Sequence, residues 1–150
     1  MFTLLAKESI LKSNLSKFIF SIYKDITKID ESFNSFFDLI VCNPPYKALK
    51  TGKISSNSKD RIIRHETTLT LKQLCREASR LLKFKGRLVI SQRTERLVET
   101  LIAMKQENLE PKRLKFCAKN KNSPPWLFLV EAKKGAKPFL EVLPTVFVDK

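Results

Sequence analysis

The chain has 150 residues, of which 43% are hydrophobic, so it is long enough for one domain with a buried core. Lysine and arginine number 29 against 15 aspartate and glutamate residues, which gives a formal net charge of +14. This charge favours a polyanionic partner such as nucleic acid, although a generally basic surface would give the same composition.

The composition argues against a metal centre, a disulfide framework and a membrane span. Cys42, Cys75 and Cys117 lie far apart, no CxxC motif occurs, and there is a single histidine. This pattern predicts free thiols in a reducing cytoplasm and no metal site. No apolar run approaches the roughly 20 residues that cross a bilayer, and the first residues do not resemble a signal peptide. We therefore expect a cytoplasmic protein without a membrane partner.

The first half of the chain predicts one helix and two strands. Apolar spacing indicates a helix over 1–13, with Asn14 as its stop. The segment 18–23, FIFSIY, favours a strand, and 26–35 has the composition of a polar connection. An unbroken apolar run predicts a second strand over 36–42, buried on both faces as in a parallel sheet.

A long loop and a helix come next. Residues 43–66 are polar, and a loop of this length in a compact domain is usually functional or disordered. Thr70 and Gln73 have the spacing of a capping box, and helical spacing of apolar residues continues from there to about Phe84. A strand over 87–92 is expected to follow.

The last third of the chain predicts a helix and two strands. Thr94 can cap the helix, which ends before Pro111. Two strands, over 112–118 and 126–133, are joined by a polar hairpin-like loop. The tail over 135–150 is expected to be extended. Strands that alternate with helices and finish in an antiparallel pair predict an α/β fold with a parallel sheet and an antiparallel edge.

The strand 36–42 ends abruptly in Asn43, Pro44, Pro45 and Tyr46. Ligands of open α/β sheets bind beyond the carboxyl ends of the strands. The side-chain oxygen of Asn43 and the carbonyl of Pro44 can both accept hydrogen bonds from an exocyclic amine such as N6 of adenine. Two prolines stiffen this backbone, and the ring of Tyr46 can stack on an extruded base. A bare Asn-Pro-Pro is more often a simple proline turn, but the buried strand before it favours a catalytic role.

The segment FDLIVCNPPY, residues 37–46, resembles the fourth motif of class I S-adenosylmethionine-dependent methyltransferases. Within them it is most similar to the tRNA1(Val) adenine-N6 methyltransferase family. The similarity continues through 64–116 and 127–148 and covers nearly all of 1–150. The resemblance implies that the chain is the C-terminal two-thirds of a single methyltransferase domain with a Rossmann-like sheet.

The resemblance also implies roles for individual residues. Asn43, Pro44 and Tyr46 match the catalytic motif that holds the target amine, with Pro45 as its rigid spacer. S-adenosyl-L-methionine is the implied cofactor, and Asp25 with Asn43 would contact it. The implied activity is methyl transfer to N6 of an adenine in tRNA.

The implied tRNA partner agrees with two clusters of basic residues. The first lies in the loop after the motif, at Lys47, Lys50, Lys53, Lys59, Arg61 and Arg64. The second comprises Lys112, Arg113, Lys115, Lys119 and Lys121. Such residues contact phosphates and give affinity and position without reading sequence. His65 is interpreted as structural or RNA-contacting, because the amine loses its proton readily and needs no base.

One part of the implied family pattern is not found in this sequence. The chain has three glycines, Gly52, Gly86 and Gly135, and no GxGxG turn to cradle the cofactor. In the family order 3-2-1-4-5-7-6, the segments 18–23 and 36–42 would be strands three and four, and strands one and two are missing. We therefore expect an exposed apolar edge near residue 41 and weak cofactor binding by the lone chain. A fragment, a chain that pairs with a second chain, and a decayed copy would each have these properties.

Two other functions remain open. A protein glutamine or a DNA adenine could be the target, because the same motif serves those methyltransferases. The chain could also be a catalytically inactive RNA-binding remnant.

Overall fold

The computed structural model describes residues 2–44 and 69–149, which divide into two units at Asp30. The first unit contains α1, Phe2–Lys12, and the short 3-10 turn η1, Ile26–Lys28. Asn14 has a φ of 55°, and the N–H of Leu15 donates to the carbonyl of Ile10 at 3.0 Å. This left-handed residue closes α1, which confirms the predicted helix and its stop.

The strand predicted over 18–23 is wrong. These residues form no strand, and Phe18, Phe20 and Tyr23 are 78–85% exposed. The segment has strong β propensity, but a strand needs a neighbour to pair its backbone groups, and the described part of the chain provides none.

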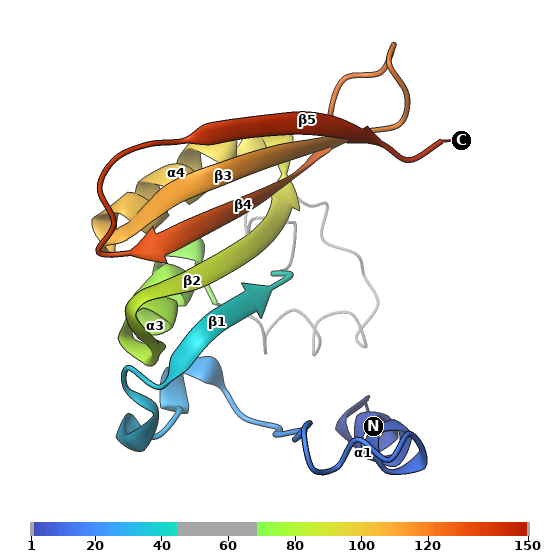
Figure 1. Ribbon diagram of the computed structural model, residues 1–150, viewed down its shortest axis with the longest axis vertical. Coiled ribbons are helices and arrows are strands. Elements are labelled where there is room, and N and C mark those ends of the chain that lie inside the picture. Colours follow the sequence, from blue (N-terminus) through green and yellow to red (C-terminus); the bar gives the residue numbers. More distant parts are fainter. Residues whose placement is uncertain (1, 45–68, 150) are drawn as a thin grey trace, which may run out of the picture. The chain divides into compact units, whose positions relative to one another are not determined.

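The second unit is built on a five-stranded sheet (Figure 1). Its strands are β1 Phe37–Cys42, β2 Leu82–Arg93, β3 Leu109–Ala118, β4 Leu127–Lys134 and β5 Glu141–Phe147. The order is β1-β2-β4-β3-β5, with β1 parallel to β2, β3 parallel to β5, and β4 antiparallel to both of its neighbours. The predicted α/β fold is confirmed, but the predicted antiparallel edge is wrong: the antiparallel strand β4 lies inside the described sheet, and β1 and β5 at its edges each pair parallel with their neighbour.

The strand order agrees with the family order in one part. β1-β2-β4-β3 reproduces the 4-5-7-6 portion, and β5 is an additional strand beside β3. The tail that we expected to be merely extended thus contains a paired strand. β2 also begins earlier than predicted, at Leu82, because the preceding helix ends at Leu81 and not near Phe84.

Two helices, α3 (Leu71–Leu81) and α4 (Leu97–Gln106), lie on the same side of this sheet (Figure 1). Alternate residues of the strands pack against the helices, and side chains from both form the buried core. The core includes Leu74, Cys75, Ala78 and Met104 from the helices and Leu88, Ile90, Phe128 and Val130 from the strands. The opposite side, which we call the open face, carries exposed apolar and charged side chains in the described residues.

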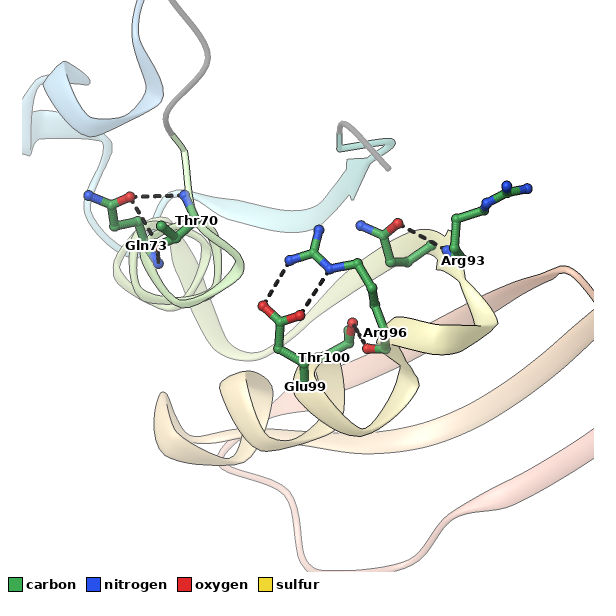
Figure 2. Close-up of polar contacts among 7 residues, drawn as sticks. Thr70, Gln73, Arg93, Arg96, Glu99 and Thr100 are labelled. Atoms are coloured by element: carbon green, nitrogen blue, oxygen red, sulfur yellow. Dashed lines mark hydrogen bonds and ion pairs between the residues drawn. The ribbon is translucent and has the colours of Figure 1, made fainter. Parts of the chain in front are cut away.

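The helix starts differ in how they are capped. The hydroxyl of Thr70 accepts from the N–H of Gln73 at 3.1 Å, and the side chain of Gln73 accepts from the N–H of Thr70 at 2.9 Å, so the predicted capping box is confirmed (Figure 2). Thr94 does not cap α4. It opens a 3-10 turn, η3 (Thr94–Arg96), and its hydroxyl donates to the carbonyl of Pro125 at 3.1 Å instead.

β1 forms one edge of the sheet. In the described residues it pairs with β2 alone, and Leu39 and Val41 are 46% and 69% exposed. The expected apolar edge is confirmed, whereas the prediction that this strand is buried on both faces is wrong. Within the described ranges no helix has the length and apolar character to cross a membrane.

Candidate active site at the ends of β1 and β2

Asn43 and Pro44, two of the predicted amine-binding residues, lie where β1 ends beside β2. Cys42 is opposite Ile90 in this parallel pair, so the next residues, Asn43 and Ser91, face each other on the open face. The hydroxyl of Ser91 donates a hydrogen bond to Oδ1 of Asn43 at 2.6 Å. The Asn43 side chain is exposed, while Pro44 is buried. An exposed carboxamide is thus anchored beside a buried proline at the carboxyl edge of the sheet.

Ser91 was not predicted as a site residue. The available signal was a polar Ser-Gln pair that ends the apolar run of the strand next to the motif. Its importance depends on the register between β1 and β2, which places Ser91 opposite Asn43. Register is a tertiary property, so the pair could not be assigned from the sequence pattern alone.

The neighbouring residue, Gln92, is completely buried on the helix-covered face. Its side-chain oxygen accepts from the N–H of Arg93 at 3.0 Å, but its amide nitrogen has no hydrogen-bond partner among the described residues. A buried polar group without a partner costs about 1–3 kcal/mol, so natural proteins rarely keep one without a reason. The side-chain nitrogen of Gln92 belongs to the end of β2, at the same edge of the sheet as Asn43.

Asp25, the predicted cofactor contact, lies in the first unit. It caps η1, where its carboxylate accepts from the N–H of Thr27 at 2.9 Å and from the hydroxyl of Thr27 at 2.8 Å. These two donors stabilise the charged form and hold the pKa of Asp25 below its ordinary value. Asp25 is therefore an exposed anion at neutral pH. Because Asp25 and Asn43 belong to different units, a shared site remains a prediction.

Several predicted site residues lie outside the described part of the chain. They are Pro45, Tyr46, Lys47, Lys50, Lys53, Arg61, Arg64 and His65.

Two residues of the second basic cluster, Lys112 and Arg113, line a shallow hollow of about 270 Å³ at the sheet. We call it the charged hollow. Its lining residues are Arg87, Lys112, Arg113, Glu131, Lys133, Phe139 and Glu141. Four basic groups thus gather with two acidic ones. Arg87 lies four residues before Ser91 on β2, and every second residue of a strand points to the same side. Its side chain therefore lies on the same open face, roughly 13 Å away along the strand.

The arginines of the charged hollow are loosely paired. Glu131 lies between them, 3.7 Å from Nη1 of Arg87 and 3.9 Å from Nε of Arg113. Charge-assisted hydrogen bonds between such groups are about 2.7–2.9 Å long, so neither guanidinium is saturated by this carboxylate. Nζ of Lys112 lies 5.2 Å from the centroid of the Phe139 ring, and the same ammonium donates to the carbonyl of Lys137 at 3.2 Å.

A different arginine, on the helical side, shows the saturated arrangement. Arg96 and Glu99 form a two-pronged pair at 2.8 and 2.9 Å beside α4 (Figure 2). The hydrogen bonds from Arg96 also hold the pKa of Glu99 below its ordinary value. Compared with this pair, Arg87 and Arg113 keep donors available for another anion.

Cys42 and Cys75 do not offer an alternative nucleophile. Burial raises the pKa of Cys75 to about 12 and also raises the pKa of Cys42, so neither thiol ionises near neutral pH. Across residues 2–44 and 69–149, no group of three His, Cys, Asp or Glu side chains could hold a metal ion. The described chemistry is therefore that of hydrogen-bond acceptors and cations.

The chain is similar in sequence to one known methyltransferase and in fold to another. No model of a known protein family matches the sequence. A tRNA1(Val) (adenine(37)-N6)-methyltransferase from Parabacteroides distasonis is 30% identical over 137 residues, which cover 89% of this chain and 56% of that protein. The chain therefore spans about half the length of this curated relative.

A solved structure shares the fold. A predicted O-methyltransferase from Agrobacterium tumefaciens matches with a TM-score of 0.71 and 17% identity, covering 97% of this chain and 63% of that one. A putative DNA modification methylase from Thermus thermophilus, solved with S-adenosyl-L-methionine, has a TM-score of 0.49 and 16% identity over 76% of this chain and 53% of its own. The chain thus has part of the class I methyltransferase fold, and its sequence is similar to that of a tRNA adenine-N6 methyltransferase.

Proposed function

We propose that this chain carries the amine-binding part of a methyltransferase that acts on N6 of an adenine in tRNA. The observation that carries the proposal is the position of Asn43, anchored by Ser91 at the carboxyl edge of a sheet with the methyltransferase strand order. The similarity to a tRNA adenine-N6 methyltransferase supplies the substrate class.

The proposed role of Asn43 follows from the chemistry of the target. The lone pair of an adenine amine is delocalised into the ring, which makes the amine a poor nucleophile. Hydrogen bonds from the amine to the oxygen of Asn43 and to the carbonyl of Pro44 favour the pyramidal nitrogen that can attack. Because Pro44 is buried and φ-restricted, its carbonyl would be held without reorganisation. Tyr46 would stack on the base, with Pro45 as a spacer.

S-adenosyl-L-methionine is the proposed methyl donor, and it would supply a methyl group attached to a positively charged sulfur. Two described residues, which belong to different units, are each proposed to contact it. The exposed, charged carboxylate of Asp25 can accept hydrogen bonds from an adenine amine or from hydroxyl groups, and Asn43 adds a carboxamide. The sequence contains no glycine-rich turn for the rest of the molecule, so we propose that further chain completes the site and the sheet beside β1.

The charged hollow supports the tRNA part of the proposal. Lys112 and Arg113 would contact phosphates there, together with Arg87 and Lys133, because these four cations outnumber Glu131 and Glu141. Six further contacts are proposed in the loop after the motif, at Lys47, Lys50, Lys53, Arg61, Arg64 and His65. The free thiols are consistent with action in the cytoplasm.

The test is methyl transfer by a chimera that joins this chain to the part of the Parabacteroides enzyme outside the matched residues. The chimera is incubated with labelled S-adenosylmethionine and, separately, with tRNA, duplex DNA and a release-factor protein. The proposal predicts label in tRNA alone. Label in DNA or in protein would assign the other target, and tRNA binding without any transfer would identify an inactive RNA-binding remnant.

A further inference from the structure

We infer that Ser91 is a positioning residue for Asn43, an inference that rests on the proposed function. The hydroxyl of Ser91 donates to the oxygen of Asn43 at 2.6 Å, which is short for a bond between an alcohol and a carboxamide. Asn43 is the first residue beyond β1.

Ser91 is well placed to hold the carboxamide. It lies on β2, which is hydrogen-bonded to β1 on one side and to β4 on the other, and it is opposite Leu129 of β4. A hydroxyl on a strand paired on both sides is among the least mobile donors of the sheet. The bond restricts the two side-chain torsions of Asn43, whose loss of freedom would otherwise oppose binding of the target amine.

The direction of the bond also matters for chemistry. A carboxamide has an accepting oxygen and a donating NH2 group, and only the oxygen can receive a hydrogen bond from an amine. Because the Ser91 hydroxyl donates, it selects the orientation of the Asn43 carboxamide in which the oxygen, and not the NH2 group, faces Ser91. Since a carboxamide oxygen can accept two hydrogen bonds, the anchoring bond is compatible with a second one from the substrate. Ser91 thus specifies an acceptor at this position.

The experiment measures discrimination for the amine, which requires no cofactor. Two RNA anticodon-type hairpins are compared, one with adenine at the target position and one with purine, which lacks the amine. Their affinities for the 150-residue chain are measured by fluorescence anisotropy. We expect the wild-type chain to prefer the adenine hairpin about tenfold, as one hydrogen bond allows.

Ser91→Ala is expected to reduce this preference to about twofold while the affinity for the purine hairpin stays the same. Ser91→Thr keeps the hydroxyl and should retain the preference. The matched control is Ser123→Ala, which removes another serine-to-asparagine hydrogen bond, from Ser123 to Asn120 at 2.9 Å in the turn before β4. It should leave the preference unchanged, since the hydroxyl of Ser123 bonds to Asn120 and not to Asn43.

Thermal unfolding of each variant separates a positioning role from a structural one. If Ser91→Ala is unfolded, Ser91→Cys provides the test, because a thiol of similar size is a weak donor and should lose the preference. A folded Ser91→Ala chain that keeps the tenfold preference overturns the inference. A wild-type chain that does not distinguish the hairpins contradicts the proposed function itself, and the inference fails with it.

Discussion

The middle and the end of β2 present different chemistry on the same open face of the sheet. At its middle, Arg87 shares Glu131 with Arg113 at distances of 3.7 and 3.9 Å, so the charges are close but loosely held. Near its end, Ser91 makes one short, uncharged hydrogen bond to Asn43. Loose cations give affinity for any phosphate, whereas a fixed acceptor distinguishes one chemical group. Under the proposed function, phosphate binding and recognition of the amine would be assigned to separate parts of the sheet.

Asn43→Ala should have the largest effect. In the chimera with the Parabacteroides enzyme we expect the rate of methyl transfer to tRNA to fall about a hundredfold or more, because a dipole aimed at the reacting amine is lost. The affinity for tRNA should stay within about twofold. Asn122→Ala, in the exposed turn before β4, is the matched control and should keep the full rate. A normal rate in Asn43→Ala would remove this residue from the mechanism.

Changes in the charged hollow should affect binding alone. Arg87→Gln with Arg113→Gln is expected to weaken tRNA binding about tenfold and to lower the slope of log K against log salt by about two, one per lost phosphate contact. The preference for the adenine hairpin should not change. Lys72→Gln with Arg76→Gln, on the exposed side of α3, removes the same charge and serves as the control. Equal losses in both double variants would show that net charge, and not the hollow, binds RNA.

Gln92→Met tests whether the buried amide of Gln92, next to Ser91, is kept for function although it lowers stability. Removal of a buried nitrogen without a partner should raise the free energy of unfolding by about 1 kcal/mol, net of the lost bond to the N–H of Arg93. We expect the adenine preference to fall at the same time. Urea unfolding and the hairpin assay check the two effects. A destabilised variant would mean that Gln92 supports the fold.

The smallest effect is expected from Glu99→Gln, on the helical side. Since the Glu99 side chain is 55% exposed, its pair with Arg96 should contribute only a few tenths of a kcal/mol at pH 7. The pKa of Glu99 is lowered in the folded state, so its contribution is present above the ordinary value of 4.5 and is lost as the pH falls through the folded value. Urea unfolding at pH 7 and pH 3 checks this, and a difference that grew on acidification would contradict it.

Local signals made much of the fold predictable. The capping box of Thr70 and Gln73 and the apolar run before Asn43 depend on neighbours in the sequence, and both are confirmed as elements of the structure. The segment 18–23 shows the limit of such signals. Its β propensity is strong, but it pairs with no strand within the described residues.

The candidate site was predictable only in part. Asn43 and Pro44 could be identified from the motif, but Ser91 required the register of β1 against β2. In the same way Arg87 is distant in sequence from Arg113, and only the arrangement of β2, β4 and β3 brings both beside Glu131. Contacts across strands depend on pairing that no short stretch of sequence encodes.

The most direct test of the account is the identity of the methylated nucleoside. tRNA treated with the chimera and labelled S-adenosylmethionine is digested to nucleosides and separated by chromatography with mass detection. The account predicts N6-methyladenosine, formed by the wild-type chimera and absent with Asn43→Ala. Label in a different nucleoside, or N6-methyladenosine formed equally by both proteins, would contradict it.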